Sequence, residues 1–285
     1  ATFNLKTPGV LTDLPQANPL VSFLAGADWF NGSWYGVENN ATDCAFWNID
    51  PTTGAGTQIG MTGFPDFTGV AFDSNHNILY GCTTTSLYTI NPLTGVATLI
   101  GPMTSVDWPS LFALSIAYDT IQDKLFVHDI AYDALFEANV LTGVAVPATG
   151  YVYGVDFNYQ QDLAFDRNTG LLYLAGTTNT VGVLYWIDPT YAGAWKIGDF
   201  QGGSLVPGFA IPWSDELEVP TVVIAADGTL SWAAIDGASS YNIYSAADPY
   251  GTFTLVANTA QLSWLDPTFP ANMMFYEVTA SSQAA

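Results

Sequence analysis

One unit recurs four times along the chain, and it constrains the fold more than any other feature of the sequence. Each copy has an apolar stretch that contains an Asp, an aromatic residue seven positions later, and a further apolar stretch beyond it. The four pairs are Asp28 and Tyr35, Asp73 and Tyr80, Asp119 and Phe126, and Asp166 and Tyr173. Because short apolar stretches separated by Gly, Asn and Asp are typical of strands, each copy is expected to be a small antiparallel sheet.

The period of the repeat predicts how these sheets pack. The aromatic residue of the third stretch recurs at Trp47, Tyr88, Phe136 and Tyr185, in steps of 41, 48 and 49 residues. That is the period of the four-stranded blade of a β-propeller. A single blade cannot bury both of its faces, so neighbouring copies must pack around a common axis. The sequence therefore predicts an all-β fold with a β-propeller domain over residues 20–213.

The number of blades depends on the two ends of this region. A fifth copy begins at Gly208-Phe209-Ala210-Ile211-Pro212 and then stops. The N-terminal segment, residues 1–19, has the pattern of a strand, a turn and a second strand between Phe3 and Leu11. It would complete the fifth blade if the propeller closes by joining its two ends. We expect about five blades, with four or six as open alternatives.

One motif within the repeat resembles a known family. Residues 87–95 read Leu-Tyr-Thr-Ile-Asn-Pro-Leu-Thr-Gly, and related segments occur in the other copies. This motif is similar to the blade signature of secreted bacterial β-propellers, over about residues 20–213. The resemblance implies a secreted bacterial protein but no particular activity, because one fold of this kind carries many functions.

A second domain is expected after a short acidic linker that runs from Pro212 to Pro220. Short alternating strands follow it, with Leu-Ser-Trp at 230–232, Ala-Ser-Ser-Tyr-Asn-Ile-Tyr at 238–244 and Phe-Tyr-Glu-Val-Thr-Ala at 275–280. These motifs resemble a bacterial fibronectin type III domain over residues 219–280. The resemblance implies an Ig-like β-sandwich that extends over residues 219–285.

This sandwich is expected to lack its last strand, because six strands precede the end of the sequence where the family has seven. The missing strand would pair with the stretch that contains Phe275, Tyr276 and Val278, which leaves an apolar edge open to pairing. Either the edge is covered by the propeller, or residues 1–14 of a neighbouring copy fill it and build a filament. The same N-terminal segment cannot also complete the fifth blade, so the two interpretations compete.

The net charge of the chain restricts the kinds of molecule that it is expected to bind. The chain has 26 acidic residues and four basic ones, Lys6, Lys124, Arg167 and Lys196, which gives a formal charge of −22. Nucleic acids and anionic membranes both require clustered Lys and Arg, so neither is expected as a partner. No apolar run is long enough to cross a bilayer. An acidic surface favours divalent cations or neutral ligands such as glycans, and the low Lys content with many Thr, Ser and Asn indicates an extracellular protein whose Ala1 is a mature terminus.

Catalytic residues are hard to identify in this sequence. His76 and His128 lie in different repeats, and neither has a Cys or a second His at metal-ligand spacing. No nucleophile-elbow motif occurs. We expect both histidines to be structural and the protein not to be an enzyme, although a carboxylate pair for glycoside hydrolysis stays open because it is assembled by folding.

Two sets of Asp residues emerge from the repeat. The first set closes the innermost strand of each blade and is expected on one face: Asp28, Asp73, Asp119 and Asp166. Asp in such a position caps its own turn, and a cation site near the axis, for example for Ca²⁺, is the alternative. The second set joins one blade to the next and pairs Asp with an aromatic residue: Asp66 and Phe67, Asp107 and Trp108, Asp156 and Phe157, and Asp199 and Phe200. This second set is expected on the opposite face, where it would bind a sugar or a cationic partner; alternatively, its aromatic residues pack between blades and its Asp residues cap turns.

The chain has two cysteines, Cys44 and Cys82. A disulfide between them and two buried free thiols are both compatible with the sequence.

Together these features predict an extracellular, non-enzymatic, cell-surface structural or adhesive protein, whose partner is a surface glycan, another protein or itself in a filament. A secreted glycan-binding or glycan-active propeller enzyme is the alternative, and a periplasmic scaffold is a third. No cofactor is expected beyond a possible Ca²⁺ ion.

Overall fold

The computed structural model describes residues 1–15, 24–30, 32–105, 108, 111–148, 154–191, 193–213, 219–235, 238–267 and 274–281. The chain divides into two compact units, Ala1–Trp213 and Ser214–Ala285. Apart from one short 3-10 turn, η1 (Gln201–Gly203), every regular element in these ranges is a strand, so the all-β expectation is confirmed. No helix in the described ranges is long and apolar enough to cross a membrane.

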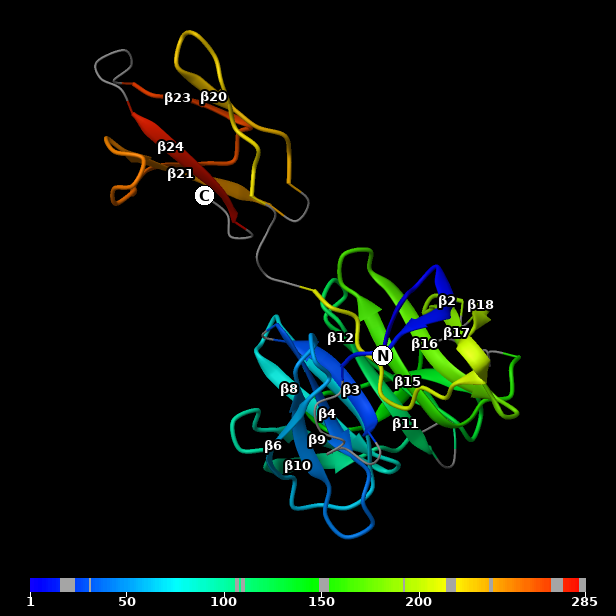
Figure 1. Ribbon diagram of the computed structural model, residues 1–285. Helices are drawn as coiled ribbons and strands as arrows, with labels where there is room; N and C mark the ends of the chain where they lie inside the picture. Colours follow the sequence, from blue (N-terminus) through cyan, green and yellow to red (C-terminus); the bar gives the residue numbers. More distant parts are fainter. Residues whose placement is uncertain are drawn as a thin grey trace. The chain divides into compact units, whose positions relative to one another are not determined.

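The first unit contains four four-stranded antiparallel sheets, and within each sheet the strands follow one another in sequence order (Figure 1). Sheet 1 comprises β3 (Leu24–Phe30), β4 (Ser33–Glu38), β5 (Ala45–Ile49) and β6 (Gly56–Met61), and sheet 2 comprises β7 (Phe67–Asp73), β8 (Ile78–Thr83), β9 (Ser86–Ile90) and β10 (Ala97–Pro102). Sheet 3 comprises β11 (Ala113–Asp119), β12 (Lys124–Asp129), β13 (Ala134–Ala138) and β14 (Ala145–Pro147), and sheet 4 comprises β15 (Asn158–Asp166), β16 (Leu171–Thr178), β17 (Val181–Asp188) and β18 (Gly193–Asp199).

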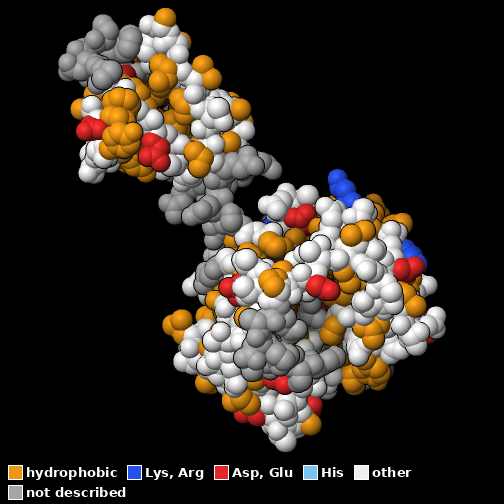
Figure 2. Space-filling view, in the orientation of Figure 1, with side chains coloured by type: hydrophobic (Ala, Val, Ile, Leu, Met, Phe, Trp, Pro, Cys, Tyr) orange, Lys and Arg blue, Asp and Glu red, His pale blue; other side chains and the backbone are white. Residues whose placement is uncertain are grey.

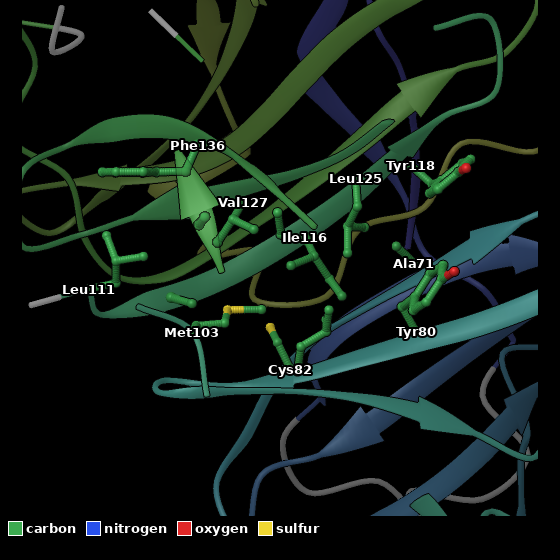
Figure 3. Close-up of a cluster of buried hydrophobic side chains, with 14 of the residues drawn as sticks. Ala71, Tyr80, Cys82, Met103, Leu111, Ile116, Tyr118, Leu125, Val127 and Phe136 are labelled. Atoms are coloured by element: carbon green, nitrogen blue, oxygen red, sulfur yellow. The ribbon is translucent and has the colours of Figure 1, made fainter. Parts of the chain in front are cut away.

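The first strands of the four sheets lie beside one another. β3 contacts β7, β7 contacts β11, β11 contacts β15, and β15 returns to β3. Each sheet buries one face against the next, as Figure 3 shows for Tyr80 and Cys82 of sheet 2 and Ile116 and Phe136 of sheet 3. These side chains are at most 3% exposed. The cores of the first unit therefore lie between neighbouring sheets.

Glycines on the outermost strands allow each sheet to touch the turn of the next one. A Cβ on Gly60 would lie 2.0 Å from the backbone oxygen of Thr94, and one on Gly101 would lie 2.3 Å from that of Thr142. In sheet 4 the glycine at the same place in the repeat, Gly198, meets Pro8 of the N-terminal segment instead. The N-terminal segment therefore stands beside sheet 4 where the turn of a further sheet would stand.

This N-terminal segment forms a two-stranded hairpin of β1 (Thr2–Asn4) and β2 (Thr7–Thr12). The ring of Phe3 lies 5.0 Å from that of Phe200 and 5.7 Å from that of Phe209. The expected fifth copy is thus incomplete in the described residues: the hairpin and an irregular segment through Phe209 take the place of a fifth four-stranded sheet. About five blades were expected, with four or six as open alternatives, and the described residues contain four complete four-stranded sheets.

The second unit contains two three-stranded sheets. One comprises β19 (Val223–Ile224), β20 (Thr229–Ser231) and β23 (Ser263–Leu265), and the other comprises β22 (Thr254–Thr259), β21 (Ser240–Ala246) and β24 (Phe275–Ser281). Leu230, Trp232, Ile243 and Val278 lie in the core of this unit.

The strand β24 lies at the edge of its sheet and has β21 as its strand partner. Its expected apolar edge is only partly exposed. Val278 is 1% exposed and points into the core, while Phe275 and Tyr276 are half-buried. Tyr276 packs on Trp264 and donates a hydrogen bond to Asp266. The open feature of β24 is therefore its backbone edge, not a row of exposed apolar side chains.

Candidate functional site

Three residues of the first Asp set cap turns at the ends of inner strands. Asp73, Asp119 and Asp166 end β7, β11 and β15. Each accepts a backbone hydrogen bond from its own turn, at 3.0 Å from His76 N, 2.8 Å from Ile121 N and 3.0 Å from Asn168 N. This is the ordinary structural role of Asp in a turn.

The fourth member, Asp28, occupies a different place. It pairs with Tyr35 across β3 and β4, whereas the residues that pair with Tyr80, Phe126 and Tyr173 are alanines. Only two residues connect Phe30 to Ser33, whereas four connect Asp73 to Ile78, so the same spacing of seven reaches a different register. The expected ring of four equivalent carboxylates is therefore wrong for Asp28.

Asp28 is half-buried and lies next to the guanidinium of Arg167. Its carboxylate accepts hydrogen bonds from Trp29 N at 2.7 Å and from Phe72 N at 2.6 Å. Burial raises the pKa of Asp28, and the charge of Arg167 and the two N–H donors act in the opposite direction. The cation beside Asp28 is thus a side chain of the protein itself.

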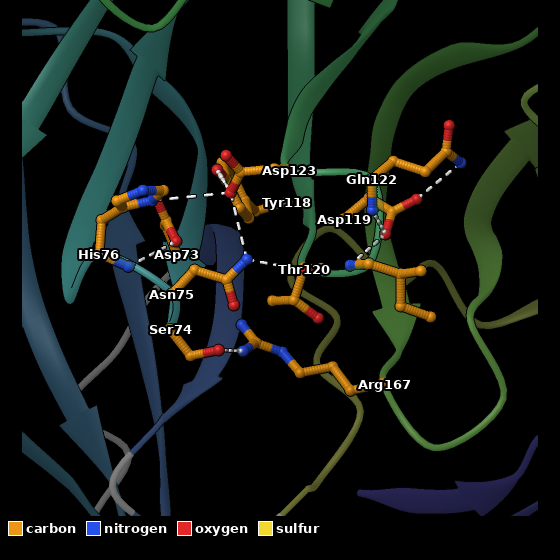
Figure 4. A network of polar contacts seen from close by, with 11 residues as sticks. Asp73, Ser74, Asn75, His76, Tyr118, Asp119, Thr120, Gln122, Asp123 and Arg167 are labelled. Atoms are coloured by element: carbon orange, nitrogen blue, oxygen red, sulfur yellow. Dashed lines mark hydrogen bonds and ion pairs between the residues drawn. The ribbon is translucent and has the colours of Figure 1, made fainter. Parts of the chain in front are cut away.

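Arg167 links sheet 4 to sheet 2 (Figure 4). Its guanidinium donates to Ser74 Oγ at 2.6 Å and to the backbone oxygen of Phe72. It also lies 4.0 Å above the ring of Trp213, a cation–π contact. The four predicted Asp residues do not come together as a metal-binding group in the described part of the chain. The group of potential metal ligands found in that part includes Asp73 but none of the other three.

The second Asp set does not form an aromatic ligand face. Phe67, Phe157 and Phe200 are 0%, 4% and 2% exposed and pack between sheets, and Trp108 packs edge-on against Phe136. Phe67, Phe157 and Phe200 are too deeply buried to contact a ligand, and the half-buried Trp108 packs against a core cluster, so the four rings do not form one exposed binding face. Asp107 lies outside the described residues.

The carboxylates of this set lie at the surface. Asp66, Asp156 and Asp199 are exposed, and Asp199 forms an ion pair of 2.7 Å with Lys196. In Figure 2 the acidic side chains are scattered over the visible face of the first unit and do not gather into one patch. They offer no concentrated acidic site there.

Both cysteines are buried free thiols. Cys44 Sγ accepts a hydrogen bond from Phe67 N at 3.3 Å, and Cys82 Sγ lies 3.4 Å from Thr68 Oγ1. Burial raises the pKa of Cys82 to about 12. The two thiols lie in different hydrophobic clusters, so the disulfide alternative is not realised.

His128 lies in β12 and is fully buried, with its ring edge-on to Phe157 at 5.5 Å. Burial lowers its pKa to about 3, so the imidazole is neutral at physiological pH. His76 lies in the exposed turn after β7, in contact with Asp73 and near Asp123. The ligand atoms of these three residues lie within 4.8 Å of one another. Sequence reasoning found Asp73 but not its two partners, which come together only because the turns of sheets 2 and 3 are neighbours.

The first unit contains a cavity of about 850 Å³. It lies where the fifth sheet is incomplete, between sheet 1 and the N-terminal hairpin. Its walls are mainly apolar, and those in the described residues are Ala1, Thr2, Phe3, Leu5, Asp13, Leu14, Leu24, Ala27, Trp34, Ile49, Gly54, Gly56 and residues 206–212. On this side of sheet 1 the described residues form no complete four-stranded sheet.

Two polar groups distinguish this cavity from an ordinary packing defect. The indole Nε1 of Trp34 is buried and has no hydrogen-bond partner among the residues that the structure describes. Asp13 is the one residue with an ionisable side chain among the lining residues that the structure describes. A buried donor without an acceptor costs about 1–3 kcal/mol, so a ligand that supplies an oxygen acceptor would gain by meeting it. The sequence signal for this site was the fifth copy that stops at Pro212, but the signal did not show which residues line the space.

No protein-family model matches the chain, and no curated protein sequence matches it. Among solved structures, the chain is similar to a protein of unknown function from Bacteroides thetaiotaomicron, with 15% identity and a TM-score of 0.41 over 81% of this chain and 58% of that one. It is also similar to a protein from Lactobacillus plantarum (15% identity, TM-score 0.38, 83% of this chain and 70% of that one). A third is the major allergen Mala s 1 of Malassezia sympodialis (11% identity, TM-score 0.43, 71% and 68%). This chain spans less than two thirds of the first of these proteins, and none of the three transfers an activity to it.

Proposed function

We propose that this protein is an extracellular, non-enzymatic binding protein, and that its ligand occupies the cavity between sheet 1 and the N-terminal hairpin. The observation that carries the proposal is the cavity of about 850 Å³, with apolar walls and the unpartnered indole N–H of Trp34. A volume of this size falls in the range of small-molecule binding sites, which are mostly apolar with a few placed polar groups.

In this proposal the first unit is a β-propeller with an incomplete fifth blade. The proposal is supported by four antiparallel four-stranded sheets whose first strands contact one another in turn. It is also supported by the contact of Gly198 with Pro8, which parallels the contacts of Gly60 and Gly101 with the turns of the following sheets. The incomplete blade creates the binding site because, among the described residues, the hairpin and residues 206–212 line the space beside sheet 1 in place of a complete sheet.

The second unit is proposed to be a fibronectin-like sandwich that acts as a spacer or adhesive part at a bacterial cell surface. Its two three-stranded sheets and the Trp232 in its core support this assignment. Secretion rests on composition, and no contact in the second unit bears on a partner.

The chemistry of the cavity favours an apolar ligand with one oxygen acceptor over a glycan. Phe3, Leu24, Ile49 and Phe209 offer apolar surface, and burial of such surface contributes about 25 cal/mol per Å². A sugar carries many hydroxyl groups, and this lining offers few side chains to bind them. Asp13 and the formal charge of −22 oppose an anionic ligand.

The absence of a catalytic grouping among the described lining residues supports a binding role. Asp13 has no His, Cys or second carboxylate beside it in the lining, so the cavity offers no nucleophile with an adjacent base.

A second candidate function is assembly of copies into a filament, and the edge position of β24 favours it. This strand is seven residues long and pairs with β21 on one side. Donation of residues 1–14 to such an edge would require the β1–β2 hairpin to leave the first unit, where Phe3 packs against Phe200 and Phe209. Sedimentation velocity of the chain with and without residues 1–14 tests it: loss of large assemblies from an otherwise folded protein supports strand donation, and unchanged assembly contradicts it.

The binding proposal is tested by titration with N-phenyl-1-naphthylamine, a neutral apolar probe whose fluorescence rises in an apolar site. Ala210 lines the cavity, so Ala210→Phe should fill part of it. Ala131 is exposed in a turn of sheet 3 and gives Ala131→Phe as the matched control. We expect one saturable site in the wild type and the control, and at least a tenfold loss of affinity in Ala210→Phe. Equal binding by all three proteins would contradict the proposal.

A further inference from the structure

The turns that follow β7 and β11 bring a histidine and two carboxylates together across the junction of sheets 2 and 3. β7 ends at Asp73, and His76 lies three residues later in its turn. Asp123 lies at the end of the turn that connects β11 to β12. Figure 4 shows the His76 ring and the two carboxylates facing one another from the two turns.

The distances between the ligand atoms are those of a compact cluster. His76 Nδ1 lies 2.8 Å from Asp73 Oδ2 and 3.7 Å from Asp123 Oδ1. One ligand atom from each residue falls within 4.8 Å of the other two. With metal–ligand bonds of about 2.0–2.2 Å, the ligand atoms of a tetrahedral site lie roughly 3.3 Å apart. The observed separations of 2.8 Å and 3.7 Å lie below and above that value.

Neighbouring groups hold the two carboxylates in position. Asp123 Oδ1 accepts hydrogen bonds from Tyr118 OH at 2.8 Å and from Asn75 Nδ2 at 3.1 Å. Asp73 Oδ1 accepts from His76 N at 3.0 Å, which leaves Oδ2 directed at the imidazole. Such outer contacts orient the ligands of metal sites. The side chain of Asp73 is 1% exposed, whereas those of His76 and Asp123 are 53% and 54% exposed and are free to adjust.

The repeat supplies an internal comparison. In the same turn of sheets 3 and 4, the place of His76 is taken by Gln122 and Thr169, and each donates a hydrogen bond to the Asp that begins its turn. The position of Asp123 in the turn of sheet 3 is occupied by Gly170 in the turn of sheet 4. The turn that contains Gln122 therefore faces a glycine, and not a carboxylate, at the corresponding position of sheet 4. In all three turns, the side chain at this position forms a hydrogen bond with the Asp that begins the turn. The combination of imidazole with a second carboxylate occurs at the junction of sheets 2 and 3 alone among these three described turns.

We propose that Asp73, His76 and Asp123 bind one divalent transition-metal ion of the Zn²⁺ class, with water in the remaining position. One imidazole nitrogen and two carboxylate oxygens suit such an ion, whereas Ca²⁺ prefers a larger set of oxygen ligands. Two carboxylates also balance the charge of the ion. The bound ion joins the turns of two neighbouring sheets, so it stabilises their packing and is separate from the ligand cavity beside sheet 1.

Isothermal titration of the metal-free full chain with zinc chloride tests this site, with a thermal unfolding scan beside it. We expect one Zn²⁺ ion per chain and a rise of several degrees in the unfolding temperature, without tight binding of calcium chloride. His76→Ala and Asp123→Asn should each weaken this binding at least tenfold and remove the temperature rise. Gln122→Ala, in the matching turn of sheet 3, should change neither. Both ligand substitutions are at half-exposed positions, so the variants are expected to fold. Circular dichroism verifies that they do.

Two outcomes would overturn the proposal. One is a single Zn²⁺ site with unchanged affinity in both His76→Ala and Asp123→Asn. The other is weak binding of several ions that all variants share, which would indicate adventitious association with the acidic surface.

Discussion

Asp162 Oδ2 in β15 accepts a 2.8 Å hydrogen bond from the backbone N–H of Ala27 in β3, a residue 135 positions earlier in the chain. The same oxygen accepts from Phe209 N at 2.9 Å. One carboxylate therefore joins the last sheet, the first sheet and the segment that leads out of the ring. Burial raises the pKa of Asp162 well above its usual range, and the backbone donors act against that rise.

Asp162→Ala is expected to destabilise the first unit strongly. It leaves the N–H groups of Ala27 and Phe209 without their acceptor in a buried place. At about 1–3 kcal/mol for each unsatisfied group, the free energy of unfolding should fall by roughly 2–6 kcal/mol. Urea denaturation followed by fluorescence measures it, with the exposed Asp156→Ala as control. A change under about 0.5 kcal/mol would show that the carboxylate does not close the ring.

Alanine at the outer glycines is expected to destabilise in a graded order. The added Cβ would meet the Thr94 oxygen at 2.0 Å for Gly60 and the Thr142 oxygen at 2.3 Å for Gly101, but only a side-chain carbon of Pro8 at 3.2 Å for Gly198. Overpacking of this kind costs about 1–3 kcal/mol. Gly60→Ala and Gly101→Ala should therefore lower the unfolding free energy more than Gly198→Ala does. Equal effects at all three positions would contradict the close approach of each sheet to the next turn.

The pH dependence of stability should contain a contribution from His128. Burial lowers the pKa of His128 to about 3, so the folded state keeps a neutral imidazole while the unfolded chain protonates near pH 6.5. The contribution is fully present above about pH 6.5 and is lost as the pH falls from there toward 3. Between pH 7 and pH 5 it amounts to about 2 kcal/mol.

His128→Gln should remove this contribution, because glutamine does not titrate. Chemical denaturation at pH 7, 6 and 5 should show a shallower loss of stability in the variant than in the wild type. Parallel pH profiles for the two proteins would mean that His128 is accessible to protons in the folded state.

The variant Trp34→Phe distinguishes the contribution of the indole N–H to ligand affinity from the contribution of the apolar ring. The variant keeps an aromatic ring but loses the buried Nε1–H that has no partner. Binding of 2-acetylnaphthalene, which has an oxygen acceptor, should weaken about five- to tenfold, in line with a hydrogen bond of about 1 kcal/mol. Binding of 2-ethylnaphthalene, which has the same shape and no acceptor, should change little. Equal effects on both compounds would place the indole N–H away from the ligand.

The repeat predicted the sheets well because strand formation depends on local pattern. The stretches that end in Asp73, Asp119 and Asp166 are the inner strands of sheets 2, 3 and 4. Asp28 was misplaced since constant spacing does not determine register: the shorter connection from Phe30 to Ser33 moves Tyr35 opposite Asp28.

The sequence repeat did not predict the candidate sites. An aromatic residue beside Asp is equally suited to a ligand face and to a core, and only packing decides that Phe67, Phe157 and Phe200 are buried. His76 and Asp123 lie 47 positions apart and meet because two turns are neighbours in space. The cavity beside Trp34 lies where the described residues form no complete fifth sheet, and the repeat pattern does not predict which residues line that space.

A crystal structure of the protein bound to 2-acetylnaphthalene would test the binding proposal most directly. The account predicts one molecule between Trp34 and Phe209, with its carbonyl oxygen within hydrogen-bond distance of Trp34 Nε1. A cavity that stays empty while the compound binds elsewhere would contradict it.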